Sequence, residues 1–308
     1  MRQLFSQFLL TASFLNNTYV PSEYEAISTQ PTFRNRSNYV EFIPGNFPII
    51  ITAPHGGYLM PVNIPERKKS PNIKLLGDLQ TQEIARQLVD YLGTLGKRPY
   101  LVICHLGRAK VDVNREPGKE AYDSLKAATV YMEYHKKVSK ASEEVNRIFG
   151  TGLYLDIHGH RHPENCIELG YLINSTQLDL PDNGLNSYSG PFSLSHLLDK
   201  HPSNKITDLI RGKSSFGGLL SSLGYKAVPS SQYTSPNGGK YYRGGYSTYK
   251  YWKVDRLDTL QVELPASIRF DVKNRGGFIH DLAQTILEFG SRWYGWSDKV
   301  QLTDQVQR

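Results

Sequence analysis

A chain of 308 residues can bury a sizeable core as one large domain. Its net charge is +7, but the basic residues are scattered, and only Arg67, Lys68 and Lys69 cluster, which favours a solvated loop over a nucleic-acid-binding patch. The sequence has no run of about 20 apolar residues that could span a membrane. Cys104 and Cys166 are too few for a disulfide framework and are expected to be buried thiols. The composition thus argues against nucleic-acid and membrane partners, and a modest positive field favours a small anionic substrate.

The N-terminus carries a short apolar stretch, residues 4–14, after Arg2. It resembles a secretory signal only loosely, because Ser6 and Gln7 interrupt it. We therefore expect a cytoplasmic protein, with a cleaved signal and secretion as the alternative. Three segments are expected: an N-terminal extension (1–45), a single folded domain (46–292) and a C-terminal tail (293–308).

Apolar runs alternate with helical spacings along the chain. Residues 47–54 form a continuous apolar run typical of a buried strand. A segment beginning at Asp78 has apolar residues at steps of three and four, as in a helix that Gly93 and Gly96 stop. The further elements are a strand (98–106), a helix (127–149), two strands (152–157 and 166–173), a loop (174–203), a helix (206–223), a Tyr/Gly-rich loop (230–251), a strand (259–264) and a helix (277–289). This order predicts an α/β fold with a mixed, mostly parallel central sheet and helices on both faces.

Two of the predicted strands end in histidines. The motif PHGG places His55 at the exit of the 47–54 strand, and its two glycines allow a tight turn and close ligand approach. The run GLYLDIHGH carries His158 at a second strand end, with Asp156 two residues earlier on the same face. Ligands of open α/β sheets bind beyond the carboxyl ends of strands. We therefore expect both imidazoles to bind one zinc ion, although each alone could be a turn histidine without a function.

A catalytic zinc ion takes three protein ligands and leaves one position for water. Asp78 and His160 are the candidates for the third ligand. A carboxylate at a helix start, such as Asp78, is also an ordinary N-cap. His160 points to the same face as His158, so that pair could chelate one metal ion. These residues alone leave the choice open.

Basic and amide side chains follow the 98–106 strand and are expected at the same rim. Arg108 and Arg115 offer guanidinium groups that match a carboxylate, and Asn114 adds a further donor. The alternative is a pair of surface arginines bonded to Asp112. We favour recognition of a substrate carboxylate.

A general base is expected among the glutamates on apolar strands, because a Glu is rarely buried without a partner. Glu263 lies near the end of the 259–264 strand, and Glu168 in the 166–173 strand is its rival. Either carboxylate could take a proton from a metal-activated water molecule and return it. Glu168 could equally anchor a neighbouring metal ligand.

The ordered series PHGG, GDLQTQEIA, GRAKVDVNRE, YLDIHGH, YYRGGYST and LQVELP resembles the N-formylglutamate amidohydrolase family over roughly residues 45–290. That family is similar to zinc carboxypeptidases and aspartoacylases. The resemblance implies a zinc-carboxypeptidase-like fold and a zinc-dependent amidohydrolase acting on a small carboxylate-bearing substrate. Candidate substrates are N-formylglutamate, another N-acyl amino acid or a peptide C-terminus. The implied roles are zinc ligands for His55 and His158, carboxylate binders for Asn114 and Arg115, and general base for Glu263.

This sequence departs from the related families at two points. The carboxypeptidases place an acidic ligand three residues after the first histidine, where this chain has Tyr58, so we assign the third ligand of a single zinc ion to Asp78. Gly159 stands where a serine is common, and His160 follows where a histidine is not usual. Both changes leave the identity of the substrate open.

The resulting mechanism has zinc lowering the pKa of a water molecule towards about 7. Glu263 would take the proton and pass it to the leaving nitrogen. Arg108 would stabilise the developing oxyanion, while Tyr246 would contact the substrate from a mobile loop over the pocket.

Two other functional classes remain alternatives. One is a metal-dependent phosphoesterase that uses His158, His160 and His162 together. The other is a non-catalytic binding protein on the same scaffold. The expected partner is a small-molecule carboxylate substrate rather than nucleic acid or a membrane, and the oligomeric state is not predicted.

Overall fold

The computed structural model describes residues 39–71, 73–118 and 120–296, so the apolar N-terminal stretch and most of the predicted tail lie outside the described residues. Its strands form one sheet in the order β1-β3-β2-β4-β7-β5-β6. Their bounds are β1 (Val40–Ile43), β2 (Ile49–Ala53), β3 (Tyr100–Cys104), β4 (Leu153–Gly159), β5 (Ile167–Gly170), β6 (Ala227–Val228) and β7 (Asp258–Leu264). Strands β3, β2, β4 and β7 run parallel, whereas β1 and β5 pair antiparallel with β3 and β7. The prediction of a mixed, mostly parallel sheet is confirmed.

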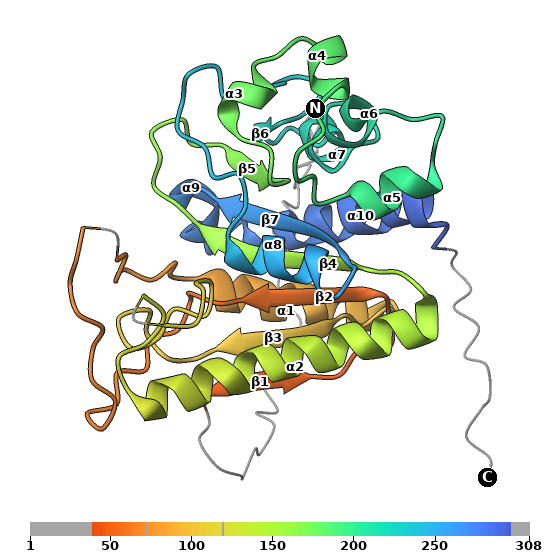
Figure 1. Cartoon of the computed structure of the whole chain (residues 1–308). Coiled ribbons are helices and arrows are strands. Elements are labelled where there is room, and N and C mark those ends of the chain that lie inside the picture. Colours follow the sequence, from red (N-terminus) through yellow and green to blue (C-terminus); the bar gives the residue numbers. More distant parts are fainter. Residues whose placement is uncertain (1–38, 72, 119, 297–308) are drawn as a thin grey trace, which may run out of the picture. The chain divides into compact units, whose positions relative to one another are not determined.

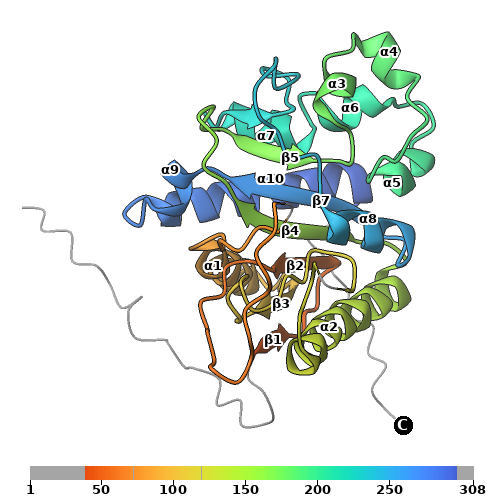
Figure 2. The same cartoon turned by 60° about the vertical axis from the view of Figure 1, so that its left-hand side comes forward.

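Helices cover both faces of this sheet, as predicted. Helices α1 and α10 pack on one face, and α2 and α8 pack on the other (Figures 1 and 2). The bounds are α1 (Thr81–Thr94), α2 (Leu125–Phe149), α3 (Ser175–Leu178), α4 (Asp182–Asn186), α5 (Ser195–Lys200), α6 (Ile206–Ile210), α7 (Phe216–Ser222), α8 (Tyr246–Lys253), α9 (Ala266–Arg269) and α10 (Arg275–Tyr294). In the described part of the chain, each helix is too short or too polar to cross a membrane.

The alternation of side chains along the strands divides the core into two layers. In β2, Ile49 and Ile51 belong to the core beneath α1 and α10, whereas Ile50 belongs to the core beneath α2. Near their carboxyl ends the strands become polar on the α2 and α8 face, where Thr52, Asp156 and Gln261 occupy neighbouring register positions. Buried polar groups on one face of a sheet need partners, and this is where the candidate site lies.

The carboxyl ends of the parallel strands share one edge of the sheet. The long loops that follow β2 and β3 both leave from this edge, towards which the strand arrows point in Figure 1. Because parallel strands place their exits side by side, residues far apart in sequence meet there.

The structure differs from the sequence-based boundaries in several places. Strand β1 lies within the segment expected as an N-terminal extension, and α10 continues to Tyr294, beyond residue 292. The expected 174–203 loop contains the short helices α3, α4 and α5. The expected 206–223 helix is divided into α6 and α7. The chain turns at Gly212, whose backbone packs against the Asp208 carbonyl oxygen of α6. Ser215 is then the N-cap of α7, because its side chain accepts a hydrogen bond from the Gly218 N–H.

Candidate active site

His55, Asp78 and His158 meet at the carboxyl ends of β2 and β4. Nδ1 of His55 lies 3.3 Å from Asp78 Oδ2, and Nδ1 of His158 lies 3.1 Å from the same oxygen. The three residues are 1%, 8% and 2% exposed, and one potential ligand atom from each lies within 4.8 Å of the others. Two imidazoles from separate strands therefore turn the same ring nitrogen towards one carboxylate.

The turn after β2 holds two of these residues together. A Cβ on Gly57 would stand 2.4 Å from the carbonyl oxygen of Leu106, so only glycine allows the turn to pack on the segment after β3. The Asp78 N–H donates to the His55 carbonyl oxygen at 2.9 Å. Helix α1 begins after Gln80 without a side-chain cap, so the Asp78 carboxylate is free of the N-cap role.

The second ring nitrogen of each histidine faces another buried carboxylate. Nε2 of His55 lies 2.7 Å from Asp112 Oδ1, and Nε2 of His158 lies 3.0 Å from Asp156 Oδ2. A carboxylate that accepts the Nε2 proton fixes the tautomer of the ring and leaves the Nδ1 lone pair free. This pairing is typical of histidines that bind a metal ion.

Asp112 stands at the centre of a charged network. Arg108 Nε donates to Asp112 Oδ2 at 2.8 Å, and the Asn114 N–H donates to Oδ1 at 3.0 Å. Although burial raises the pKa of Asp112, His55 and Arg108 hold that pKa well below its usual range. The network keeps Asp112 anionic beneath His55.

Arg67 corrects the expectation of a solvated basic loop. Its side chain is buried and donates to the carbonyl oxygens of Lys74, Arg108 and Glu120. It also lies 3.7 Å from Asp112 Oδ2. Arg67 therefore ties the loops after β2 and β3 to each other.

Asp78 and Asp156 are also held by neighbouring groups. Burial raises the pKa of Asp78, but the neighbouring rings of His158 and His55 hold it well below the usual range. The Thr52 hydroxyl donates to Asp156 Oδ1 at 2.6 Å. Two imidazoles and one anionic carboxylate form a donor set that suits zinc.

Glu263 lies at the end of β7, in register with His158 on β4. Its Oε1 accepts a hydrogen bond from Gln261 Nε2 at 2.9 Å, whereas its buried Oε2 has no hydrogen-bond partner in the described ranges. Burial raises the pKa of Glu263 to about 8. An unpartnered buried carboxylate oxygen beside the histidines is placed to exchange a proton.

Glu168 lies on β5, directly opposite Glu263 of the neighbouring strand β7. Both of its carboxyl oxygens have hydrogen-bond partners. Its Oε1 lies 2.7 Å from His162 Nδ1, and its Oε2 accepts from the Tyr242 N–H at 2.7 Å. Burial raises the pKa of Glu168 to about 8. This carboxyl group belongs to a separate cluster.

His160 lies in that separate cluster rather than beside His55. Its Nδ1 accepts from the His162 N–H at 3.0 Å, and its Nε2 lies 2.9 Å from the Cys166 carbonyl oxygen. Both ring nitrogens are therefore engaged by backbone groups. The structure brings Asp78, and not His160, to the two strand-end histidines.

Close packing explains the glycine at position 159, where the families that the sequence resembles commonly have a serine. A Cβ at this position would lie 2.3 Å from Arg269 Nε. The buried Arg269 guanidinium uses that space to bind the carbonyl oxygens of His160, Leu79 and Leu264. A larger residue would displace this anchor between α9 and the strand exits.

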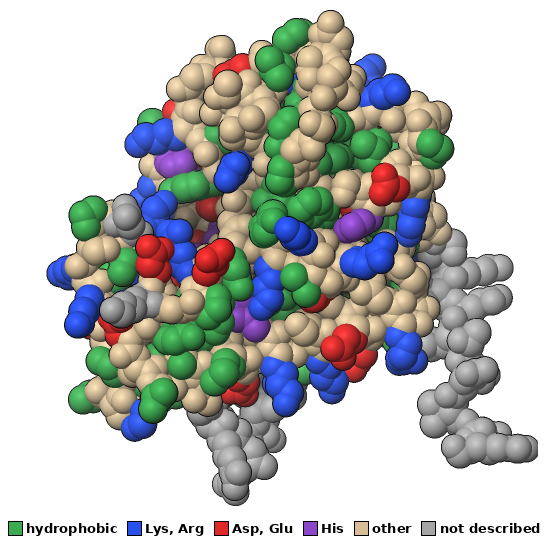
Figure 3. Space-filling view, in the orientation of Figure 1, with side chains coloured by type: hydrophobic (Ala, Val, Ile, Leu, Met, Phe, Trp, Pro, Cys, Tyr) green, Lys and Arg blue, Asp and Glu red, His purple; other side chains and the backbone are tan. Residues whose placement is uncertain are grey.

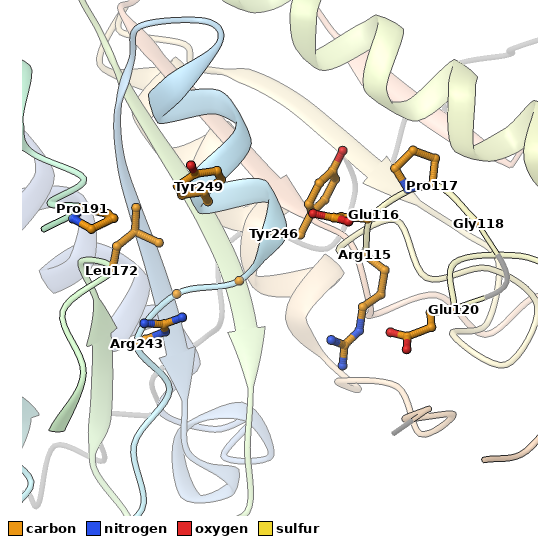
Figure 4. A pocket seen from close by; sticks show the side chains of 12 residues that line it. Arg115, Glu116, Pro117, Gly118, Glu120, Leu172, Pro191, Arg243, Tyr246 and Tyr249 are labelled. Carbon is orange, nitrogen blue, oxygen red and sulfur yellow. The ribbon is translucent and has the colours of Figure 1, made fainter. Parts of the chain in front are cut away.

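A pocket of about 700 Å³ is lined by residues that adjoin Asn114, such as Arg115 and Gly245, whereas none of His55, Asp78, His158 and Glu263 lines it (Figure 4). The predicted substrate-binding residues Arg115 and Tyr246 line it, but Asn114 does not. The Asn114 side-chain oxygen accepts from the Ser247 N–H at 2.8 Å, and its nitrogen lies 3.2 Å from His158 Nε2. Asn114 thus holds the start of α8 against the candidate metal ligands.

Arg243 was not assigned a role from the sequence, yet it lines the same pocket as Arg115, from the opposite side (Figure 4). Its carbonyl oxygen accepts from the Leu172 N–H at 2.6 Å. Within the described residues its guanidinium group makes no hydrogen bond or ion pair. The only sequence signal was its place in YYRGGYST, before two glycines.

Arg108 lies at the edge of the cluster rather than in the pocket wall. Its Nη1 is 3.9 Å from Asp78 Oδ1. On the face shown in Figure 3, Lys and Arg side chains are interspersed with Asp and Glu rather than gathered in one basic patch. The positive charge at the site therefore comes from individual arginines, such as Arg108, and not from a basic patch.

Comparisons with known proteins bear on the fold. No protein-family model matches the sequence, and no curated protein matches it significantly. Among solved structures, an N-formylglutamate amidohydrolase from Ralstonia eutropha JMP134 is similar, with a TM-score of 0.51 at 14% identity, over 83% of this chain and 99% of that one. A gene product from Agrobacterium tumefaciens is also similar, with a TM-score of 0.51 at 12% identity, over 83% of this chain and 96% of that one. The chain therefore shares its α/β fold with these two proteins.

Proposed function

We propose that this protein is a zinc-dependent hydrolase that cleaves an amide bond in a small carboxylate-bearing substrate. One zinc ion would be held by His55, Asp78 and His158. The observation that carries this proposal is the convergence of two buried Nδ1 atoms on one carboxylate, each ring being oriented by a further aspartate. The shared fold with an N-formylglutamate amidohydrolase supports the reaction class.

A zinc ion bound there would supply Lewis acidity that polarises the amide carbonyl and acidifies water. Glu263 takes a proton at its unpartnered Oε2 and returns it to the leaving nitrogen. Burial raises the pKa of Glu263 to about 8, and the charge of a bound zinc ion would lower it, so that the carboxylate could take a proton and give it up again. Arg108, beside Asp78, stabilises negative charge on the carbonyl oxygen.

The pocket supports an anionic substrate. Arg115 would bind the α-carboxylate, and Tyr246 would contact the substrate from the start of α8. Arg243 offers a second guanidinium group across the pocket, which suits the γ-carboxylate of N-formyl-L-glutamate. Other N-acyl amino acids and peptide C-termini remain candidates, because the pocket volume accommodates them.

Amine release by chelator-stripped protein, with and without one equivalent of zinc, tests this function. The substrates are N-formyl-L-glutamate, N-acetyl-L-glutamate, N-formyl-L-methionine and a short peptide with a free carboxylate. We expect zinc to restore release of free amine from at least one of them. Release that does not depend on zinc, or no release from any substrate by zinc-loaded protein, would contradict the proposal.

A further inference from the structure

We infer that Tyr131 of α2 is a positioning residue whose hydroxyl group places Arg115 for binding the substrate carboxylate. This inference rests on the proposed function, because it concerns the same pocket. It adds a residue that does not line the pocket and that no sequence motif indicated.

The contact with the Arg115 segment is a hydrogen bond to the main chain. The Tyr131 hydroxyl donates to the Arg115 carbonyl oxygen at 2.8 Å. Within the described ranges, no other hydrogen bond reaches the main chain of Arg115. Its side chain is about one-third exposed, and Nε lies 3.9 Å from Asp112 Oδ2. The position of this guanidinium group therefore depends on how the peptide after Arg115 is held.

Burial raises the pKa of Tyr131 well above its usual value, so the hydroxyl group keeps the proton that it donates to the Arg115 carbonyl oxygen. Tyr246, the first residue of α8, lines the same pocket as Arg115 (Figure 4).

Aromatic packing holds the Tyr131 ring in place. The ring is 4.3 Å from the ring of His135 and 5.2 Å from that of Tyr122, measured between centroids. Burial lowers the pKa of His135 to about 3, so the ring stays neutral, and its Nδ1 lies 2.6 Å from the Tyr251 hydroxyl oxygen. A phenylalanine at position 131 would fill the same space and lose only the hydroxyl group.

The test is Tyr131→Phe assayed with N-formyl-L-glutamate and N-formyl-L-isoglutamine, which differ only in the α-carboxylate. We expect KM for N-formyl-L-glutamate to rise about 3- to 10-fold with kcat nearly unchanged, since one neutral hydrogen bond is lost. The efficiency for isoglutamine should not change, so the preference for the carboxylate falls. Tyr122→Phe is the matched control, because the Tyr122 hydroxyl makes no hydrogen bond within the described residues, and it should leave both values as in the wild type.

An unchanged preference for the α-carboxylate in Tyr131→Phe, or a loss in kcat alone, would overturn the inference. A second measurement does not depend on turnover or on metal. Amide hydrogen exchange in chelator-stripped protein should be faster at residues 113–118 in Tyr131→Phe than in Tyr122→Phe, and equal exchange would also overturn it. If the wild type releases amine from no substrate, the proposed function fails, while the exchange comparison still decides whether Tyr131 holds the loop.

Discussion

His158 and Glu263 are directly paired in the parallel register of β4 and β7, so an imidazole and a carboxyl group leave neighbouring strands at the same level. His158 is oriented by Asp156, whereas Glu263 keeps one buried oxygen without a partner. The pairing of β4 with β7 therefore places a candidate metal ligand, His158, beside a candidate general base, Glu263. In the proposed function, this arrangement would separate binding of a metal ion from handling of the proton.

Replacing Glu263 by Gln tests that separation. We expect kcat for the best substrate to fall by about 10²- to 10⁴-fold, because the amide cannot take up or return a proton. Zinc content should stay at one equivalent per chain. Metal analysis and steady-state kinetics on the same preparation measure both.

Glu168→Gln is the matched control, because Glu168 has the same buried environment but both its oxygens are engaged. It should retain most of the activity. If instead Glu168→Gln were inactive and Glu263→Gln active, the base would be Glu168.

Asp156→Asn should weaken zinc binding by about 10- to 100-fold, because the neutral amide orients His158 less well and polarises its ring less. Competition with a chromophoric chelator measures the affinity. Asp258→Asn is the control, since Asp258 is another buried aspartate of the sheet, and it accepts a hydrogen bond from the Leu197 N–H of α5. Equal zinc affinity of the Asp156 variant and the wild type would remove Asp156 from this role.

Arg243→Gln should reduce kcat/KM for N-formyl-L-glutamate by about 10-fold, the size of a charge-assisted hydrogen bond at a partly exposed site. The value for N-formyl-L-glutamine, which lacks only the γ-carboxylate, should change little. Arg115→Gln should instead reduce both values, because both compounds carry the α-carboxylate. A parallel loss on both compounds in Arg243→Gln would show that Arg243 does not read the γ-carboxylate.

The sequence predicted the sheet and the meeting of His55 with His158 at a candidate site because both depend on local patterns. Continuous apolar runs mark the buried parallel strands, and His55 and His158 follow from their place at strand ends. Once those strands lie side by side, the carboxyl edge brings the two residues together. The fold class and the meeting of these two side chains thus follow from the periodicity of apolar residues and from the order of strands and helices along the chain.

The supporting contacts were not predictable because they join loops distant in sequence. Asp112 was considered only as a partner of arginines, yet it binds His55 across 57 positions. Helix α8 fell in a predicted loop, since its first turn is held by Asn114 from 133 residues away. Arg67 was expected to be solvated because the residues next to it in the sequence do not indicate that three carbonyl oxygens surround its side chain in the fold.

Stability should depend on pH through Glu168. Its pKa is raised from 4.5 to about 8, so the folded protein holds a proton that the unfolded chain loses above pH 4.5. The free energy of unfolding of the wild type, relative to that of Glu168→Gln, therefore falls as the pH rises from 4.5 to about 8, by about 1.4 kcal/mol per pH unit. Above that range the difference stays constant. Denaturant unfolding of chelator-stripped proteins near pH 5 and pH 9 measures this difference. The same difference at both pH values would show that Glu168 ionises normally when buried.

The central claim is that one zinc ion binds to His55, Asp78 and His158. Anomalous diffraction at the zinc edge, on crystals of protein loaded with one equivalent of zinc, tests it most directly. We predict a single peak bonded to Nδ1 of both histidines and to the Asp78 carboxylate. A peak between His160, His162 and Glu168, or no peak at either cluster, would contradict the account.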